Sequence, residues 1–374
     1  MRIGVLAEAV EGETRVAATP DTVKAYVKKG LRVVVQAGAG KGSFLSDDAY
    51  AKAGASIGAD PGGLAGCDVI LTVRRPSAEA LAAVKEGALI IGQMDPYGEA
   101  GGIAALAKQG HSLFSMELMP RISRAQSMDV LSSQANLAGY KAVIDAAAKF
   151  SRAFPMMMTA AGTVAPARVF VMGAGVAGLQ AIATARRLGA VVSATDVRAA
   201  VAEQVQSLGA KFIFIAGLKD AASAGGYALE LSEEDRERQA ALVAEHIANQ
   251  DIVITTALIP GRPAPQLVSR EMVESMKAGS VIVDLAVERG GNCVLSKPGQ
   301  TVEHHGVFIM GHHNLAAGLA GNASALYARN LQNLVDLIVA GDGSLKVDWN
   351  DEIIKGIALA RNGEIIHPVL AAKG

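Results

Sequence analysis

The sequence is poor in cysteine and in net charge, and each shortage excludes a class of protein. Its 374 residues include two cysteines, Cys67 and Cys293, which do not form a CxxC pair and have no histidine cluster near them in sequence. We therefore expect two buried thiols in a reducing cytoplasm, and no zinc site or disulfide framework. Lysine and arginine total 35, aspartate and glutamate total 36, and the formal net charge is -1. Because no block of like charge occurs, a nucleic-acid-binding function is not expected.

Uninterrupted long apolar runs are also missing. Between Ala153 and Ala185 the single charged residue is Arg168, but Pro155, Pro166 and several glycines divide this stretch. The pieces are shorter than the roughly 20 apolar residues that a membrane-spanning helix needs. The opening residues MRIGV are typical of a strand and not of a secretory leader. We therefore expect a soluble chain.

Two series of short apolar runs indicate an α/β fold with two domains. The first 120 residues contain the runs RIGVLAE, LRVVVQAG, DVILTVR, ALIIGQ and SLFSME, separated by helical patterns. A second series contains RVFVMG, AVVSATD, KFIFIA, DIVITTA, SVIVDLA and GVFIMG. Strands that alternate with helices in this way predict parallel sheets covered on both faces.

The final 60 or so residues contain too few expected elements to fold alone. We therefore predict two doubly wound (Rossmann-like) parallel-sheet domains, the second inserted into the first. The expected boundaries are 1–126 with 310–374 for the first domain, and 127–309 for the second. A helix over 136–150 is expected to lie near the start of the second domain.

A glycine-rich turn in the second series indicates a dinucleotide site. Gly173, Gly175 and Gly178 follow a strand and open a helix, where they allow a tight turn, close approach of a pyrophosphate, and close packing. The next strand ends at Asp196, whose carboxylate can accept hydrogen bonds from the adenosine ribose. The same carboxylate would repel a 2′-phosphate, so NAD is favoured over NADP. Arg198 leaves NADP open, because an arginine there can accommodate that phosphate.

Further residues are expected at the carboxyl ends of the same strands. Thr255, Thr256, Ala257 and Leu258 follow the fourth strand, and Leu258 could pack against a flat ring. The long connection over 217–250 contains Gly225-Gly226-Tyr227, which could be the hinge of a lid. A surface loop without a function remains an equal alternative.

The segment RISRAQSMDVLSSQ, residues 121–134, is rich in hydrogen-bonding side chains and precedes an apolar region. It could bind a cofactor, or it could be a polar helix start with Asp129 as the cap. The paired histidines His312 and His313 could act in catalysis, but neither belongs to a recognisable dyad, and a structural or surface role is the alternative.

Several segments resemble the NAD(H)-binding component, domain I, of proton-translocating nicotinamide nucleotide transhydrogenase. They are MELMPRISRAQSMDVLSSQANLAGYKAVI, FPMMMTAAGTVAPARVFVMGAGVAGLQAIATARRLGA, and ITTALIPGRPAP with VIVDLAVERGGNC after it. Alanine dehydrogenase is more distantly similar in fold and opening motif. Its substrate lysine corresponds to Arg74 here, and its catalytic histidine is replaced within IIGQMDPYG. These departures favour transhydrogenase, because hydride transfer between two nicotinamides needs no acid or base, only two rings held close together.

The resemblance implies a set of site residues. Arg121, Gln126, Asp129 and Ser132 would surround the nicotinamide and orient it for hydride transfer. No metal is expected. The residues implied at the NAD(H) cofactor are Ile122, Ser123, Ser127, Met128, Val171, Gly173, Gly175, Val176, Ala177, Gly178, Asp196, Val197, Arg198, Gly226, Tyr227, Gln239 and Leu258.

The resemblance also implies partners. An NADP(H)-binding domain and membrane-spanning proton-channel subunits would be separate chains, and the chain would be a homodimer. It would be cytoplasmic and held at the inner face of the membrane through those subunits. An amino-acid dehydrogenase resembling alanine dehydrogenase and a non-catalytic NAD sensor are the alternatives.

Overall fold

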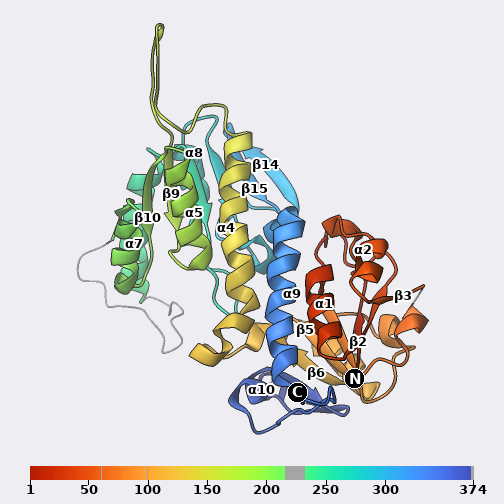
Figure 1. The fold of residues 1–374 in the computed structure, drawn as a ribbon. Coiled ribbons are helices and arrows are strands. Elements are labelled where there is room, and N and C mark those ends of the chain that lie inside the picture. The colour runs from red at the N-terminus through yellow and green to blue at the C-terminus, as the bar shows by residue number, and fades with distance from the viewer. Residues whose placement is uncertain (60, 99, 215–231, 372–374) are drawn as a thin grey trace. The chain divides into compact units, whose positions relative to one another are not determined.

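The chain divides into two compact units. The computed structural model describes residues 1–59, 61–98, 100–214 and 232–371. Unit 1 comprises Met1–Gln134 and Ala317–Gly374, and unit 2 comprises Ala135–Ala316 (Figure 1). Helix α4, Val130–Lys149, carries the chain from one unit into the other. Along the sequence, unit 2 is therefore an insertion within unit 1.

Unit 1 contains a mixed sheet. Within the described ranges its strands follow the order β17-β16-β6-β5-β4-β1-β2-β3. The strands from β1 to β6 pair in parallel, whereas β16 pairs antiparallel with both β6 and β17. The C-terminal segment thus supplies an edge of this sheet. The strands are β1 Arg2–Val5, β2 Arg32–Gln36, β3 Ser56–Gly58, β4 Val69–Arg74, β5 Leu89–Gln93, β6 Ser112–Ser115, β16 Ala358–Arg361 and β17 Glu364–Ile365.

Helices cover the sheet of unit 1 on both faces. Ile3 and Val5 pack in one core with residues of α1 and α9, while Ile70 and Ile90 pack in a second core with residues of α3. Thr19 caps α1 in a capping box with Thr22, which fixes the start of that helix at a proline. The helices are α1 Pro20–Lys28, α2 Asp47–Lys52, α3 Ala100–Lys108, α9 Ala320–Leu337, α10 Glu352–Ile357 and α11 Pro368–Ala371, and the 3-10 helices include η1 Lys41–Ser43, η2 Pro61–Leu64, η3 Glu79–Leu81, η4 Met116–Leu118 and η5 Ser123–Met128.

Unit 2 contains the second large sheet, with the order β11-β10-β9-β12-β13-β15-β14 among the residues placed by the structure. All neighbours pair in parallel except β14 and β15. The strands are β9 Arg168–Met172, β10 Val191–Thr195, β11 Lys211–Phe212, β12 Ile252–Thr255, β13 Val281–Asp284, β14 Gln300–His304 and β15 Val307–Gly311.

Alternation along β9 explains why both faces of this sheet are covered. Val169 and Val171 pack on one face with α4 and α5, and Phe170 and Met172 pack on the other face with α7 and α8. Such a strand is apolar at every position because neither face meets water. The helices are α5 Val176–Arg187, α6 Ala202–Ser207, α7 Glu233–Ile247 and α8 Arg270–Ser275, with the 3-10 helices η6 Ala199–Val201, η7 Val287–Arg289 and η8 Leu315–Leu319.

The predicted α/β class with two Rossmann-like sheets is confirmed, with the difference that both sheets are mixed and not purely parallel. Two features were not predicted from the sequence. One is the short strand β3, and the other is a hairpin of β7 Met157–Thr159 and β8 Gly162–Val164, which extends away from the sheet of its unit (Figure 1).

Candidate functional site

The strand order of unit 2 locates a crevice. The chain starts at β9, proceeds outward to β10 and β11, and then returns to β12 on the other side of β9. In open parallel sheets ligands bind at this switch point, beyond the carboxyl ends of the strands. The segments that leave the sheet there begin at Gly173, Asp196, Thr256 and Leu285.

The three glycines after β9 have three different local reasons. Gly173 has a φ of +102°, which L side chains rarely adopt. A Cβ at Gly178 would lie 1.8 Å from the carbonyl oxygen of Gly173, so no side chain fits there. A Cβ at Gly175 would meet no atom within 4 Å. Gly175 is therefore not required by packing within the chain, and it faces open space where a ligand could approach the backbone.

The N-terminus of α5 adjoins this open space. Gly175 is its N-cap and offers no side chain to the first amides of the helix. Gly139 of α4 packs directly on the first turn, since a Cβ there would lie 2.0 Å from the carbonyl oxygen of Ala177. Val176 is 40% exposed. The first turn of α5 is thus held in place, and its amides suit a phosphate.

Asp196 follows β10 and is 7% exposed. Its Oδ2 accepts a hydrogen bond of 2.7 Å from the backbone amide of Ala174, which ties it to the glycine turn. Its Oδ1 accepts from the backbone amide and Nε of Arg198, at 2.9 and 2.8 Å, and its Oδ2 also accepts from Nη2 of Arg198 at 2.7 Å. The carboxylate therefore lies beside the predicted pyrophosphate position, paired with the arginine two residues later in the sequence.

Thr256 closes the turn from the neighbouring strand. Its Oγ1 donates to the carbonyl oxygen of Gly173 at 3.1 Å. Asn292, which is fully buried, then holds the segment after Thr256: its Oδ1 accepts from the amide of Ala257, and its Nδ2 donates to the carbonyl oxygens of Ala257 and Pro265.

Asp284, at the end of β13, is fully buried and organises the next loop. It accepts hydrogen bonds from Oγ1 of Thr255, Oγ of Ser296, and the backbone amides of Ala286, Asn292 and Cys293. We did not predict roles for Asp284 or Asn292. A carboxylate ending an apolar strand and an asparagine after two glycines, in VIVDLAVERGGNC, are the available signals.

The remaining predicted residues of unit 2 lie in different environments. Val171 is fully buried in β9, so its side chain serves the core. Val197 is half-buried after Asp196, Gln239 is half-buried on α7, and Leu258 is 46% exposed. Gly226 and Tyr227 lie outside the described residues.

The polar segment 121–134 belongs to unit 1, and its contacts are mostly local. Asp129 accepts from the backbone amide and Oγ of Ser132, at 2.9 and 2.5 Å, and so caps the first turn of α4. The guanidinium of Arg124 forms a bidentate ion pair with Asp351. Arg121, Ser123, Gln126 and Ser127 are exposed, Ile122 is half-buried, and Met128 is buried in the core of unit 1.

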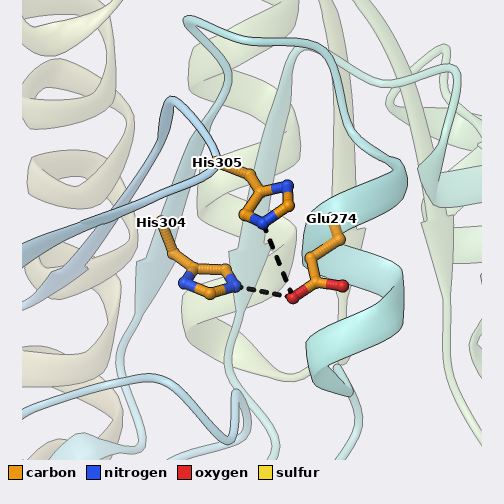
Figure 2. A group of neighbouring side chains, drawn as sticks. All are labelled: Glu274, His304 and His305. Carbon is orange, nitrogen blue, oxygen red and sulfur yellow. Dashed lines mark hydrogen bonds and ion pairs between the residues drawn. The ribbon is translucent and has the colours of Figure 1, made fainter.

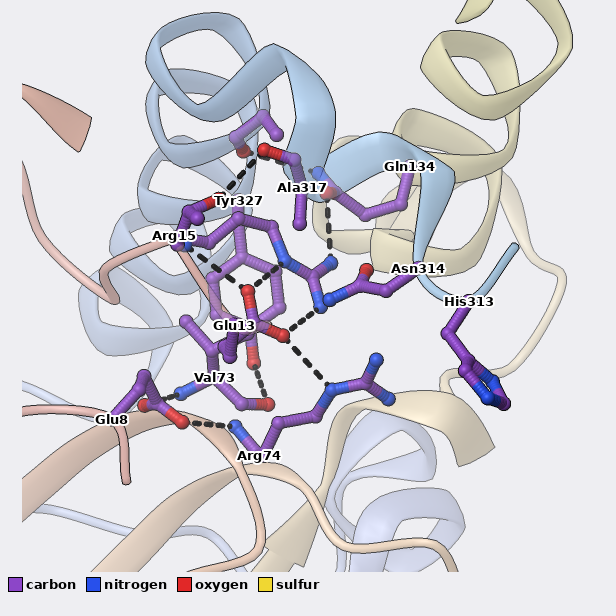
Figure 3. A network of polar contacts seen from close by, with 12 residues as sticks. Glu8, Glu13, Arg15, Val73, Arg74, Gln134, His313, Asn314, Ala317 and Tyr327 are labelled. Carbon is purple, nitrogen blue, oxygen red and sulfur yellow. Dashed lines mark hydrogen bonds and ion pairs between the residues drawn. The ribbon is translucent and has the colours of Figure 1, made fainter. Parts of the chain in front are cut away.

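Unit 1 has its own polar cluster beyond the carboxyl ends of β1 and β4 (Figure 3). The side chain of Glu13 is fully buried and pairs with Arg15 at 2.6 Å and with Nε of Arg74 at 2.9 Å. Burial pushes the pKa of Glu13 up, but the hydrogen bonds and charge of Arg15, with the charge of Arg74, outweigh it and hold that pKa below its ordinary value. Nη1 of Arg15 also donates to Oε1 of Gln134 at 3.0 Å.

A cavity of about 460 Å³ adjoins this cluster, lined by Glu8, Glu13, Arg15, Lys41 and the exposed ring of Phe44, among others. Arg74 occupies the place of the substrate lysine of alanine dehydrogenases. Its pairing with Glu13 means that it does not offer an unopposed charge to a small carboxylate.

His312 and His313 make separate contacts. Nε2 of His312 lies 2.8 Å from Oγ1 of Thr301, and Nδ1 of His313 lies 3.8 Å from Oε1 of Glu288. The two histidines thus have separate polar partners, and a catalytic role for them stays untested.

Comparisons with known proteins identify the family. The model described as "Alanine dehydrogenase/PNT, N-terminal domain" matches residues 4–138, and "Alanine dehydrogenase/PNT, C-terminal domain" matches residues 142–368. The chain belongs to the alanine dehydrogenase/PNT family. This confirms the family resemblance noted in the sequence.

Within the alanine dehydrogenase/PNT family, the chain is 52% identical to an NAD(P) transhydrogenase subunit alpha polypeptide of Rhodospirillum rubrum, with 100% of both chains covered. A solved transhydrogenase structure from Sinorhizobium meliloti is 55% identical, covers 98% of this chain and 99% of its own, and superposes with a TM-score of 0.87. An L-alanine dehydrogenase structure, 23% identical, covers 100% of this chain and 98% of its own with a TM-score of 0.82, which shows the shared fold.

Some members of the alanine dehydrogenase/PNT family are longer than the region they share with this chain. The NAD(P) transhydrogenase subunit alpha of Cereibacter sphaeroides is 45% identical over 98% of this chain, and the match covers 71% of that protein. In the described part of the present chain, no helix combines the length and apolar character needed to cross a membrane.

Proposed function

We propose that this chain is the NAD(H)-binding component of a proton-translocating NAD(P) transhydrogenase. It transfers hydride between its own NAD(H) and NADP(H) held by a partner subunit. The observation that carries the proposal is end-to-end similarity to proteins named NAD(P) transhydrogenase, in a chain with a glycine turn open at Gly175. The reduced nicotinamide supplies the hydride, and the chain supplies binding and orientation.

The residues of the crevice fit a dinucleotide. The amides at the start of α5 bind the pyrophosphate, because Gly175 leaves them accessible. Asp196 binds the adenosine ribose, and Arg198 gives up part of its ion pair when the ribose arrives. Gly173 and Gly178 keep the turn close to the sheet. Val176, Ala177, Val197, Gln239 and Leu258 are assigned to the same cofactor.

Arg121, Gln126, Asp129 and Ser132 are assigned to the nicotinamide end. Gln126 is exposed and has an amide suited to the carboxamide of the ring. Asp129 and Ser132 cap α4, so they hold the segment in shape as well as offering oxygens. No proton is moved in the transfer itself, and the rate depends on how well the two rings are placed.

The partners in this proposal are an NADP(H)-binding domain and membrane-spanning proton-channel subunits, with this chain on the cytoplasmic side. A homodimer is proposed as well. The β7–β8 hairpin supports a protein contact, because Met156, Met157 and Met158 are 61%, 43% and 81% exposed on a two-stranded ribbon. Sedimentation of the wild type and of a Met156→Ser, Met158→Ser variant tests this, and a monomeric wild type would contradict it.

One experiment separates the candidate functions. The purified chain is mixed with NADH and a purified NADP-binding partner, and separately with NADH, pyruvate and ammonia. Hydride exchange that depends on the partner supports the proposal. Oxidation that depends on pyruvate supports an amino-acid dehydrogenase instead, and NADH binding without either reaction supports a sensor.

A further inference from the structure

Two histidines and a glutamate meet at one point on unit 2. Nε2 of His304 lies 2.8 Å from Oε1 of Glu274, and Nε2 of His305 lies 3.9 Å from the same oxygen. One ligand atom from each of the three residues lies within 4.8 Å of the others. Figure 2 shows both rings directed at the carboxylate, which comes from α8, while the histidines come from the end of β14 and the turn after it.

The backbone holds the two histidines in this arrangement. His304 pairs with Val307 in the antiparallel β14–β15 ladder, which leaves a two-residue turn of His305 and Gly306. Both turn residues have positive φ, +49° and +75°, as in the tight turns that match strand twist. A Cβ at Gly306 would lie 2.9 Å from Cβ of Ala278, so the turn rests on the segment that follows α8.

The carboxylate is held equally well. Ser269 caps α8 by accepting a hydrogen bond from the amide of Met272, and Met272 and Val273 are buried under the helix. Glu274 follows on the outer side, with its side chain 33% exposed. The three groups are therefore presented by two anchored elements, and the site is open to solvent.

We propose that Glu274, His304 and His305 bind one divalent transition-metal ion of the Zn²⁺ class. Zinc binds imidazole nitrogen and carboxylate oxygen at about 2.0–2.2 Å, which in a tetrahedron places neighbouring ligand atoms roughly 3.3 Å apart. The two measured separations, 2.8 and 3.9 Å, bracket that value. Small side-chain rotations complete three corners, and water takes the fourth. Two imidazoles exclude Mg²⁺ and Ca²⁺ as the preferred ions, because those cations select oxygen ligands.

Arg270 opposes the metal. Its Nη1 lies 3.5 Å from the same Nε2 of His304 that faces Glu274. A bound cation would have to displace this guanidinium, and its charge would repel the ion. Removing the charge of Arg270 should therefore tighten metal binding, which an unspecific surface interaction would not require.

The position of the site separates it from the dinucleotide crevice. His305 and Gly306 precede β15, and Glu274 precedes β13, so the cluster lies at the amino ends of parallel strands. The glycine turn lies at their carboxyl ends. The metal would link α8 to the β14–β15 hairpin at the edge of the sheet, and its binding does not depend on the proposed function.

The test uses the full chain without a histidine tag. Titration calorimetry with Zn²⁺ should give one site per chain, and Co²⁺ should develop the visible absorption of a tetrahedral complex. Glu274→Gln, His304→Gln and His305→Gln should each weaken binding by at least about tenfold. Arg270→Gln should strengthen it, and saturating Zn²⁺ should leave NADH affinity unchanged.

A matched control comes from the other histidine pair of unit 2. His312→Gln and His313→Gln retain the cluster and should bind Zn²⁺ like the wild type. The inference is overturned if the wild type takes up no stoichiometric Zn²⁺, or if uptake survives the three cluster variants and is lost in the control pair. Circular dichroism and NADH binding on every variant distinguish loss of ligands from loss of the fold.

Discussion

Arg198 holds both carboxylate oxygens of Asp196, with Nε 2.8 Å from Oδ1 and Nη2 2.7 Å from Oδ2. Backbone amides of Ala174 and Arg198 add one hydrogen bond to each oxygen. A carboxylate has about four lone-pair positions, so all of them are taken. A ribose bound here must compete with Arg198, and this competition can be measured.

Asp196→Ala should weaken NADH binding by about 1–3 kcal/mol, because a buried hydrogen-bonding partner is lost. Titration of the NADH fluorescence measures the change. Asp196→Asn is the control, since its oxygen can still accept from the amide of Ala174 and hold the glycine turn. Unchanged affinity in the alanine variant would refute the ribose assignment.

Arg198→Ala should have the opposite effect on NADH. Without the guanidinium, the carboxylate is available to the ribose, and NADH should bind more tightly. NADPH should bind more weakly than to the wild type, because the unpaired Asp196 repels a 2′-phosphate. A variant that prefers NADPH would show that Arg198 is not the competitor described above.

Gly175→Ala and Gly178→Ala form a matched pair within one turn. Gly175 has a φ of -79° and open space beyond it, so alanine should leave the thermal stability unchanged while hindering the pyrophosphate and weakening NADH binding. Gly178 has no room for a methyl group, and its alanine variant should be less stable by roughly 1–3 kcal/mol. Thermal denaturation and NADH titration of both variants give the comparison. Equal losses of stability would contradict the distinction.

Gln126→Ala should slow hydride exchange more than it weakens NADH binding, because ring placement acts on the transfer step. Partner-dependent exchange and NADH titration provide the two numbers. Arg124→Gln is the nearby control, since Arg124 is engaged with Asp351. Equal losses of rate and affinity would make Gln126 an ordinary binding contact.

His111→Leu should stabilise the protein. His111 is 1% exposed, and neither ring nitrogen has a hydrogen-bond partner among the residues that the structure describes. Burial lowers the pKa of His111, against a smaller opposite effect of the Glu86 charge. Two unsatisfied nitrogens cost about 1–3 kcal/mol, which leucine avoids.

The pH dependence of this effect has a definite sign. The folded protein holds the His111 proton less tightly than the unfolded chain, so wild-type stability falls as the pH drops through about 6.5 toward the lower folded pKa. The advantage of His111→Leu should therefore grow on acidification. Chemical denaturation at about pH 8 and about pH 5.5 measures it. His367→Leu is the control: Nδ1 of His367 accepts from the amide of Val369, so that variant loses a contact.

Local patterns were sufficient to predict much of the fold. The buried strands β9 and β12 are apolar at nearly every position, and the glycine spacing after β9 reflects contacts only a few residues away, such as Gly178 with Gly173. The α/β class and the site of the glycine turn therefore followed from the sequence. The edge strands were harder. β3 is three residues long, and β16 pairs with β6 across more than 200 positions, which no local pattern records.

Side-chain pairing could not be read in the same way. Asp129 fits a helix cap and a cofactor ligand equally well in sequence, and in the structure it does cap α4. Asn292 reaches Ala257 and Pro265 on a different loop, so its sequence neighbours carry no sign of its role. The cluster of Glu274 with His304 and His305 joins positions about thirty residues apart and was missed for the same reason.

The buried carboxylate of Asp284 has a consequence for engineering the chain. Because one side chain collects hydrogen bonds from Thr255, Ser296 and three backbone amides of the loop that follows β13, the length of that loop is constrained. An inserted residue between Ala286 and Cys293 would pull donors out of reach and strand a negative charge in the interior. Reporter groups or affinity tags are better attached elsewhere, and variation in homologues at this point should be confined to substitutions.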